Sequence, residues 1–172
     1  MVPHFTYCLL VWGAKIFQDH PVHLLQKRAL RIVTHNDYIA HSEPICKELR
    51  LVKVPDLYRL SVWKFYYKLM NNKLPPYFES MKPQLPEVCN THYIRRPTFH
   101  LPNITHEFAE HMLRFQLIKI LNDENGSLMI IEKVFTHSFQ GFKLYIKNNL
   151  IDSYSDQCYI INCEACERMS LR

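Results

Sequence analysis

The sequence predicts a mainly α-helical protein, an irregular helical bundle with a long proline-rich extended connection and a cysteine-containing C-terminal tail. Apolar residues recur at helical spacing over several segments of the chain. The 172 residues include only 3 glycines against 10 prolines, which favours helices punctuated by prolines. Hydrophobic residues make up 48% of the chain, enough for a buried core and too many for a disordered protein.

The distribution of prolines and cysteines divides the chain into four parts. Residues 1–74 and 105–154 have apolar residues at helical spacing, so we expect both to be helical units. Residues 75–104 contain six of the ten prolines, which predicts an extended connection. Residues 155–172 contain three of the six cysteines and form the expected tail.

The first expected element is residues 5–12, which are apolar nearly all round and predict a buried helix. A core element so close to Met1 suggests a piece of something longer, with an exposed apolar edge that favours self-association. The run is too short to span a bilayer, and no basic segment precedes it as in a secretory signal. We therefore expect an intracellular protein, in the nucleus or cytoplasm, with no membrane partner and no disulfides.

A basic helix follows, from Pro21, which is typical of a first helical position, to about His35. The residues that share its expected core face are Leu25, Ala29 and Ile32, widened by Leu30 and Val33. Its cations, which project from the other sides, are Lys27, Arg28 and Arg31. Such a helix can bury one side and offer cations to an acidic partner, and a solvated basic face is the alternative.

Two more helices are expected before the proline-rich connection. Ser42 is a candidate N-cap of a short helix that ends near Arg50. Residues 57–74 form the strongest predicted helix, which Pro75 and Pro76 end. Its first apolar stripe is Tyr58, Val62, Phe65, Tyr66 and Leu69, and its second is Leu57, Leu60, Tyr67 and Met70. Two stripes predict a central helix that is packed from more than one side.

The C-terminal unit is expected to begin at Thr105, a candidate N-cap, with a helix to about Asn122. Its expected inward residues are Phe108, Met112, Phe115 and Ile118. A turn at 123–127 leads to helices at 128–135 and 138–154. The last helix has an inward stripe of Phe139, Phe142, Ile146 and Leu150, with Lys143 and Lys147 outside.

Several short motifs occur along the chain in a distinctive order. They are Pro3-His4-Phe5-Thr6-Tyr7-Cys8, Val11-Trp12-Gly13, Leu24-Leu25-Gln26-Lys27-Arg28-Ala29-Leu30-Arg31-Ile32, Leu49-Arg50-Leu51, Asp56-Leu57-Tyr58, Leu74-Pro75, Tyr93-Ile94-Arg95-Arg96 and Phe142-Lys143. This order resembles the region downstream of the polymerase palm in Jockey-like non-LTR retrotransposon reverse transcriptases. The resemblance covers nearly the whole chain and is most specific in its first half. The family's usual tryptophan-asparagine-leucine-proline turn is replaced by Leu121-Asn122-Asp123.

The resemblance implies that residues 1–74 are a thumb-like unit and that the chain would help to hold an RNA/DNA template–primer. Polymerase chemistry needs clustered carboxylates that bind magnesium, and no two aspartates of this chain are adjacent. We therefore expect no catalytic residues and no polymerase activity. The expected partners are RNA or DNA, bound without sequence specificity, and the missing upstream polymerase region.

The net charge of +5 and the pI near 8.9 are compatible with nucleic-acid binding. The candidate binding cations are Lys27, Arg28, Arg31, Arg95, Arg96, Lys143 and Lys147. Tyr66, Tyr67 and Tyr93 are candidates for stacking on bases, with core packing as the alternative for the first two. Two other functions stay open: a helical protein-interaction module whose basic face meets an acidic partner, and a non-functional translated retroelement fragment.

The tail carries the candidate metal site. Cys163 and Cys166 have the C-x2-C spacing of zinc ligands, and Cys158 offers a third thiolate. The fourth ligand would come from His137, Cys89 or Cys46, or from a second chain. Free cysteines are the alternative, and no cofactor other than zinc is expected.

Overall fold

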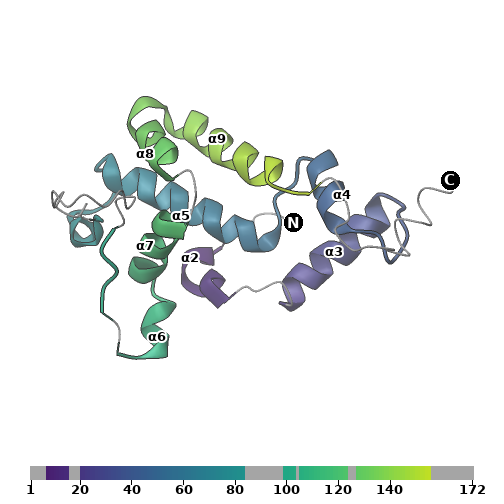
Figure 1. The fold of residues 1–172 in the computed structure, drawn as a ribbon, viewed down its shortest axis with the longest axis horizontal. Helices are drawn as coiled ribbons and strands as arrows, with labels where there is room; N and C mark the ends of the chain where they lie inside the picture. Colours follow the sequence, from purple (N-terminus) through teal and green to yellow (C-terminus); the bar gives the residue numbers. More distant parts are fainter. Residues whose placement is uncertain (1–6, 16–19, 84–98, 104, 124–126, 156–172) are drawn as a thin grey trace, which may run out of the picture.

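The computed structural model describes residues 7–15, 20–83, 99–103, 105–123 and 127–155 (Figure 1). These residues are mainly helical and contain no strand, which confirms the predicted fold class. The elements are α2 (Leu9–Trp12), the 3-10 helix η1 (Gly13–Lys15), α3 (Pro21–Val33), α4 (Ser42–Glu48), α5 (Val54–Met70), the 3-10 helix η2 (Pro76–Met81), α6 (Glu107–Glu110), α7 (Leu113–Asp123), α8 (Ser127–Thr136) and α9 (Phe139–Asp152). None of these helices combines the length and the apolar composition that crossing a bilayer requires.

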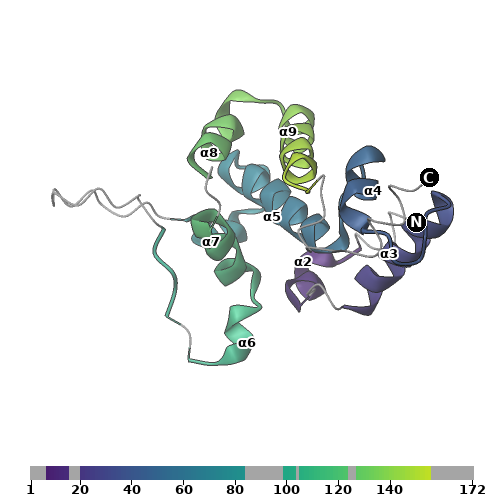
Figure 2. The same cartoon turned by 45° about the vertical axis from the view of Figure 1, so that its right-hand side comes forward.

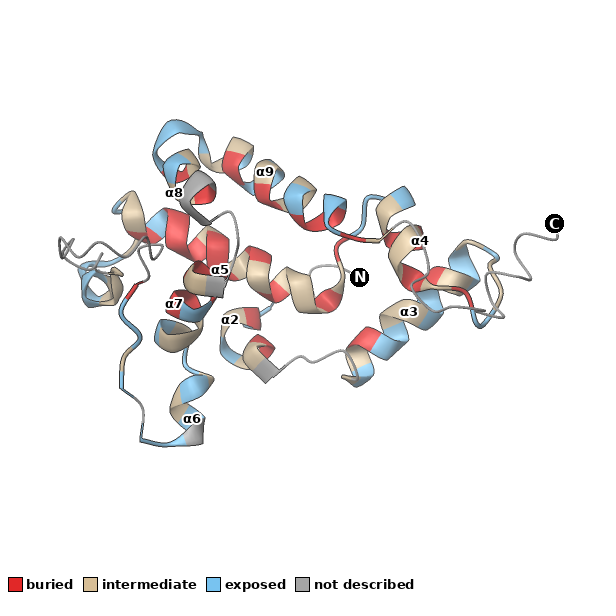
Figure 3. Ribbon diagram, in the orientation of Figure 1, coloured by how far each residue is buried: buried red, intermediate tan, exposed pale blue. Residues whose placement is uncertain are grey.

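Helix α5 lies at the centre of the bundle, as its two apolar stripes predict. Helix α9 runs along one side of it, α2 and α7 lie on another, and α3 packs near its N-terminal end (Figures 1 and 2). All residues of the first stripe are buried, and Leu60 and Tyr67 of the second stripe are buried as well (Figure 3). Leu57 and Met70 are half-buried at the margin of the core.

The main core joins the two predicted helical units. Trp63 and Tyr66 of α5 meet edge to face, with ring centroids 5.8 Å apart. Tyr67 packs on Phe142 of α9 with centroids 5.1 Å apart, and Leu117 of α7 is buried in the same cluster. Residues 1–74 and 105–154 therefore contribute to one core through α5. A second cluster, which closes the end of the bundle around α3 and α4, consists of Leu30, Ala40, Ile45, Cys46, Val52, Ile151 and Tyr154.

Helix α5 ends before the prolines that were expected to stop it. Its last residue is Met70, and Asn72 adopts the left-handed conformation with φ 53°. The amide of Lys73 then donates to the Lys68 carbonyl at 2.8 Å, which closes the helix end. The Asn71 side chain also donates to the Val134 carbonyl of α8 at 3.2 Å. The left-handed conformation of Asn72 and the contact of Asn71 with α8 therefore end the helix before Pro75.

The expectation of an N-terminal segment buried all round is wrong for the residues that can be compared. Leu9 is buried, but Tyr7 and Val11 are 77% and 79% exposed. Helix α2 has only four residues and rests one side on α5, so its outer positions face solvent. Residues 5 and 6 of the predicted segment lie outside the described part of the chain.

The helix predicted from Thr105 is broken in two. Helix α6 ends at Glu110, and α7 starts at Leu113. Phe108 and Met112, which were expected to face inward, are 70% and 53% exposed. The break shifts the register, and the buried residues of α7 are Leu117, Ile118, Ile120 and Leu121. Helix α9, by contrast, begins after a Ser138 cap and buries Phe142, Ile146 and Leu150 as predicted.

Candidate nucleic-acid interface

Helix α3 turns a different face to the core from the one expected. His23 and Leu30 are its buried residues, only 3% and 7% exposed. Leu25, Ile32 and Val33, which were expected in the core, are 60%, 73% and 72% exposed. The apolar spacing was correct, but the stripe that it defines lies at the surface.

Polar contacts with the loop before α5 orient α3 in this way. The Gln26 side chain donates to the Val52 carbonyl at 3.0 Å and accepts from the Val54 amide at 2.9 Å. His23 Nδ1 lies 3.4 Å from the Gln26 side-chain oxygen. These bonds satisfy backbone groups next to buried residues, so they hold the Gln26 side of α3 inward. Hydrophobic periodicity considers apolar residues only, so it could not show that Gln26 fixes the inward face of α3.

The three cations of α3 have different environments. Arg28 is exposed, whereas Lys27 and Arg31 are half-buried. Arg31 donates from Nε to the Ala40 carbonyl at 2.7 Å and lies over the Tyr38 ring, 6.0 Å from its centroid. Arg31 therefore fastens the loop after α3. Arg28 remains the α3 cation that is open to a partner.

Lys27 belongs to a mixed-charge group rather than to a basic face. Burial alone would raise the pKa of the Glu43 carboxyl, but the hydrogen bond and the charge of Lys53 lower it, and all the lowering effects together bring this pKa below 4.5. The Ser155 amide and the charge of Lys27 lower the pKa further. Because Glu43 offsets part of the positive charge here, this end of α3 is a weak site for phosphate.

A second group of cations lies on α5 and α9, and we call Lys64, Lys68 and Lys143 the lysine group. Lys64 and Lys68 are one turn apart on α5, and Lys143 of α9 is close enough to lower the pKa of Lys64. Burial is the main cause of that lowered pKa, and the charges of Lys143 and Lys68 add to it. Within the described residues, no carboxylate pairs with any of the three. The group is therefore a local excess of positive charge.

Among the described residues, the structure places the predicted nucleic-acid cations of α3 and α9 apart instead of on one surface. Helix α3 packs near the C-terminal end of α9, whereas Lys143 lies in the N-terminal half of α9 (Figure 1). Lys147 is half-buried, and Arg95, Arg96 and Tyr93 lie outside the described residues. Sequence analysis missed Lys64 and Lys68. Their four-residue spacing between the two apolar stripes of α5 was the available signal.

Tyr66 and Tyr67 pack in the core, in line with the alternative reading of these residues. They are 2% and 3% exposed, and the Tyr67 hydroxyl donates to the His137 carbonyl at 2.9 Å. Burial also raises the pKa of Tyr66 to about 12. Neither ring is available to stack on a base.

The candidate zinc ligands Cys158, Cys163 and Cys166 lie outside the described residues, as does Cys89. Of the residues considered for the fourth position, Cys46 is 1% exposed, and burial raises the pKa of its thiol to about 11. A zinc ligand must be a thiolate, so Cys46 is poorly suited to the role. His137 is exposed between α8 and α9. The described part of the chain contains no group of three or more histidine, cysteine, aspartate or glutamate side chains arranged to bind a metal.

Within the described residues, fold and charge together define a mainly helical protein with one central helix, an exposed Arg28 on α3 and, apart from it, the lysine group on α5 and α9. Comparison with protein-family models, with curated proteins and with solved structures found no match to this chain.

Proposed function

We propose that this chain is a helical nucleic-acid-binding unit without polymerase activity, a remnant of the post-palm region of a Jockey-like non-LTR retrotransposon reverse transcriptase. The order of its sequence motifs supports the origin. The lysine group is the main support for nucleic-acid binding. Its three cations lie on two adjacent helices, and no carboxylate of the described residues pairs with them. The proposed ligand is the phosphate backbone of RNA or DNA.

The chemistry of the lysine group fits phosphate contacts without reading of sequence. An ammonium group is a compact point charge that attracts phosphate oxygens, and it lacks the planar fork with which arginine reads a guanine edge. Each phosphate that is neutralised releases condensed counterions, so the affinity should fall steeply with salt. Arg28 lies apart from the lysine group and would add at most a separate contact.

Fluorescence anisotropy of a short labelled RNA–DNA duplex, titrated with the protein over a salt series, tests this proposal. We expect binding at low salt that weakens as salt is raised. Lys143→Gln should lower the slope of log affinity against log salt by about one unit. Lys119→Gln is the matched control, because Lys119 is an exposed lysine of α7 outside the lysine group. No binding at low salt, or an unchanged slope for Lys143→Gln, would contradict the proposal.

A second candidate function, protein interaction, is favoured by one observation. The outer face of α3, which we define as Leu25, Arg28, Ala29, Ile32 and Val33, exposes apolar side chains at helical spacing around one cation. This pattern is typical of a helix that packs against a partner. Sedimentation velocity of the wild type and of Ile32→Glu tests it against self-association. Concentration-dependent association that Ile32→Glu abolishes would support this function, and a monomer at all concentrations would count against a second copy as the partner.

A further inference from the structure

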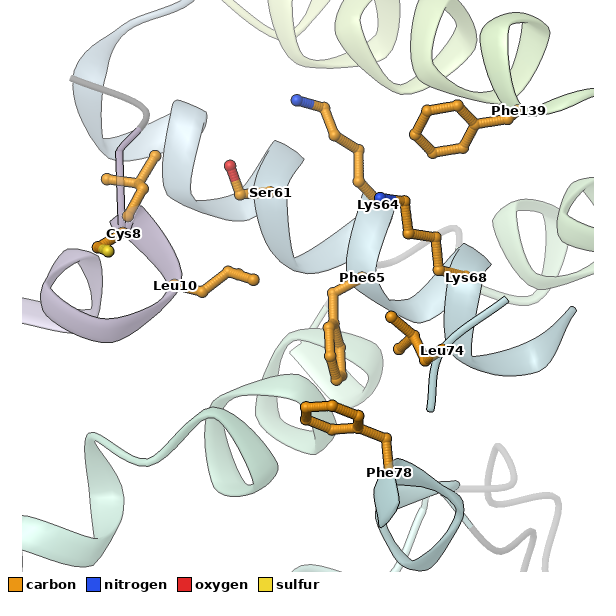
Figure 4. A pocket seen from close by; sticks show the side chains of 10 residues that line it. Cys8, Leu10, Ser61, Lys64, Phe65, Lys68, Leu74, Phe78 and Phe139 are labelled. Atoms are coloured by element: carbon orange, nitrogen blue, oxygen red, sulfur yellow. The ribbon is translucent and has the colours of Figure 1, made fainter. Parts of the chain in front are cut away.

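A pocket lies beside α5, between α2, the segment that includes η2, and the start of α9 (Figure 4). Its volume is about 460 Å³, within the range of small-molecule sites. Its apolar lining residues are Leu9, Leu10, Phe65, Leu74, Phe78 and Phe139. Its charged lining residues are Lys64 and Lys68, and no carboxylate of the described residues lines it. The pocket therefore combines an apolar wall with positive charge alone.

The lysines and one part of the apolar lining occupy different sides of the pocket, while Phe139 lies on the side of the lysines. Figure 4 shows the rings of Phe65 and Phe78 together on one side and the side chains of Lys64 and Lys68 on the other. The two phenyl rings meet edge to face with centroids 5.7 Å apart. The ammonium of Lys68 lies 5.5 Å from the centroid of the Phe139 ring, so this cation stands next to apolar surface. A ligand with one apolar and one anionic end would match this division.

The state of Lys64 also favours an anion. Its side chain is half-buried, and burial is the main reason why its pKa lies below 10.5, with the charges of Lys143 and Lys68 contributing. A half-buried ammonium surrounded by like charges is stabilised when an anion approaches. Ser61, the polar uncharged side chain of α5 in the lining, already donates its hydroxyl proton to the Leu57 carbonyl at 2.8 Å. The lining thus offers little hydrogen bonding to a polar ligand body.

We propose that this pocket binds an amphipathic carboxylate, whose aliphatic chain occupies the apolar part while its carboxylate lies between the ammonium groups of Lys64 and Lys68. A carboxylate suits this partly buried position better than a phosphate monoester, because removing one negative charge from water costs less than removing nearly two. This site shares Lys64 and Lys68 with the proposed nucleic-acid surface, but it also needs the apolar pocket, so variants that fill the pocket test it separately.

Isothermal titration calorimetry of the full chain with dodecanoate, dodecanol and dodecyl phosphate tests the ligand class. We expect dodecanoate to bind to one site, more tightly than either of the other two. Equal affinity for dodecanol would show that the negative charge of the ligand does not contribute to binding. Tighter binding of dodecyl phosphate would overturn the choice of a carboxylate head group. Absence of dodecanoate binding would overturn the proposal altogether.

Variants locate the site. Lys64→Met and Lys68→Met keep the aliphatic stem and should each weaken dodecanoate binding about tenfold, as expected for loss of a charged hydrogen bond. Ser61→Phe should abolish binding by filling the pocket, and Leu74→Phe provides a second filling variant should the first unfold. Lys119→Met, a lysine of α7 outside the pocket, should bind as the wild type does. Wild-type affinity in both lysine variants, or in a folded filling variant, would overturn the site.

The filling variants also separate this inference from nucleic-acid binding. Ser61→Phe retains all three lysines of the lysine group, so the salt dependence of nucleic-acid affinity should match that of the wild type. Loss of dodecanoate binding with this salt dependence unchanged supports a distinct small-molecule site. Loss of both in a variant that circular dichroism shows to be folded would contradict a role of the pocket that is separate from the nucleic-acid surface.

Discussion

The Tyr154 hydroxyl donates a 2.7 Å hydrogen bond to Asp56 Oδ2 and so ties the chain just beyond α9 to the first turn of α5. The same hydroxyl accepts a 3.0 Å hydrogen bond from the Lys53 amide, and the Lys53 ammonium lies over the ring, 4.2 Å from its centroid. Tyr154 is 5% exposed, and burial, with the nearby Asp56 charge, raises its pKa well above the usual tyrosine range. The hydroxyl therefore stays protonated and keeps donating at any physiological pH.

Tyr154→Phe should lower the free energy of unfolding by about 1–3 kcal/mol, because it leaves the Lys53 amide without its acceptor and removes the donor to Asp56. Urea denaturation measures this loss. Tyr77→Phe is the control, since Tyr77 is 85% exposed and should show no change. Equal stability of Tyr154→Phe and the wild type would show that the buried hydroxyl contributes no net stability.

Gly13 permits the close approach of α2 to α5. A methyl group at this position would lie 2.5 Å from Cδ2 of Tyr58, which is buried at 5% exposure and cannot withdraw freely. Gly13→Ala should therefore destabilise the fold by about 1–3 kcal/mol through overpacking. Thermal unfolding followed by circular dichroism measures the effect.

Gly141 provides the matched comparison. It lies in the first turn of α9, and the nearest atom to an added methyl group is the Ser138 hydroxyl oxygen at 3.4 Å, an ordinary contact. Gly141→Ala should stabilise the chain by up to about 1 kcal/mol, because alanine is the better helix former. The two glycine variants should thus shift the melting temperature in opposite directions, and destabilisation of similar size in both would contradict the steric argument.

His23 makes stability depend on pH. Burial is the main cause that lowers its pKa below 6.5, helped by Lys27 and Lys53 and opposed by the Gln26 hydrogen bond and the Asp56 charge. Because the folded state binds this proton less well than the unfolded state, stability should fall as the pH drops below about 7.5 through the unfolded pKa. The loss should be complete below the lowered pKa of the folded state.

Urea denaturation at about pH 7.5 and about pH 5.5 tests this sign. The wild type should be less stable at the lower pH, and His23→Phe should lose less stability between the two. His100→Gln is the control, because His100 is exposed and should leave the wild-type pH dependence intact. The Glu43 carboxyl, whose pKa lies below 4.5, affects stability mainly at more acid pH. A pH dependence of His23→Phe identical to that of the wild type would contradict the assignment.

Tyr58 carries a buried hydroxyl without a hydrogen-bond partner among the described residues. Burial raises the pKa of this group to about 12. Tyr58→Phe should be neutral or stabilising, because it removes a desolvated polar group and keeps the ring that packs on Gly13. Chemical denaturation decides the matter, and a loss of more than about 1 kcal/mol would indicate that the hydroxyl has a partner in solution.

Sequence patterns predicted the parts of the fold that depend on apolar periodicity alone. The two stripes of α5 and the inward stripe of α9 are confirmed, because both helices pack along most of their length and their register is not interrupted. The face of α3 was wrong, since Gln26 anchors it through two backbone contacts that lie 26 and 28 residues along the chain. The break between α6 and α7 was missed because Phe108 continues the spacing although its helix stops.

The candidate site was less predictable than the fold for a related reason. Charge in the sequence does not show which cations are already engaged, as Arg31 is with the Ala40 carbonyl. Lys64 is a single lysine among apolar residues, so the sequence pattern did not indicate a binding role for it. Its proximity to Lys143 depends on the packing of α5 against α9. A proposed cluster that spans two helices becomes visible only once their contact is known.

The central position of α5 also sets the order of events during synthesis. The Tyr67 hydroxyl of α5 bonds to the His137 carbonyl, 70 residues further along the chain. At a translation rate of about 5–20 residues per second, the cover for this side of α5 is made several seconds after α5 itself. During that interval Tyr67 and its neighbours on α5 have no α9 to pack against. The buried face of α5 is therefore made before the helices that cover it, which is the condition under which a nascent chain binds chaperones.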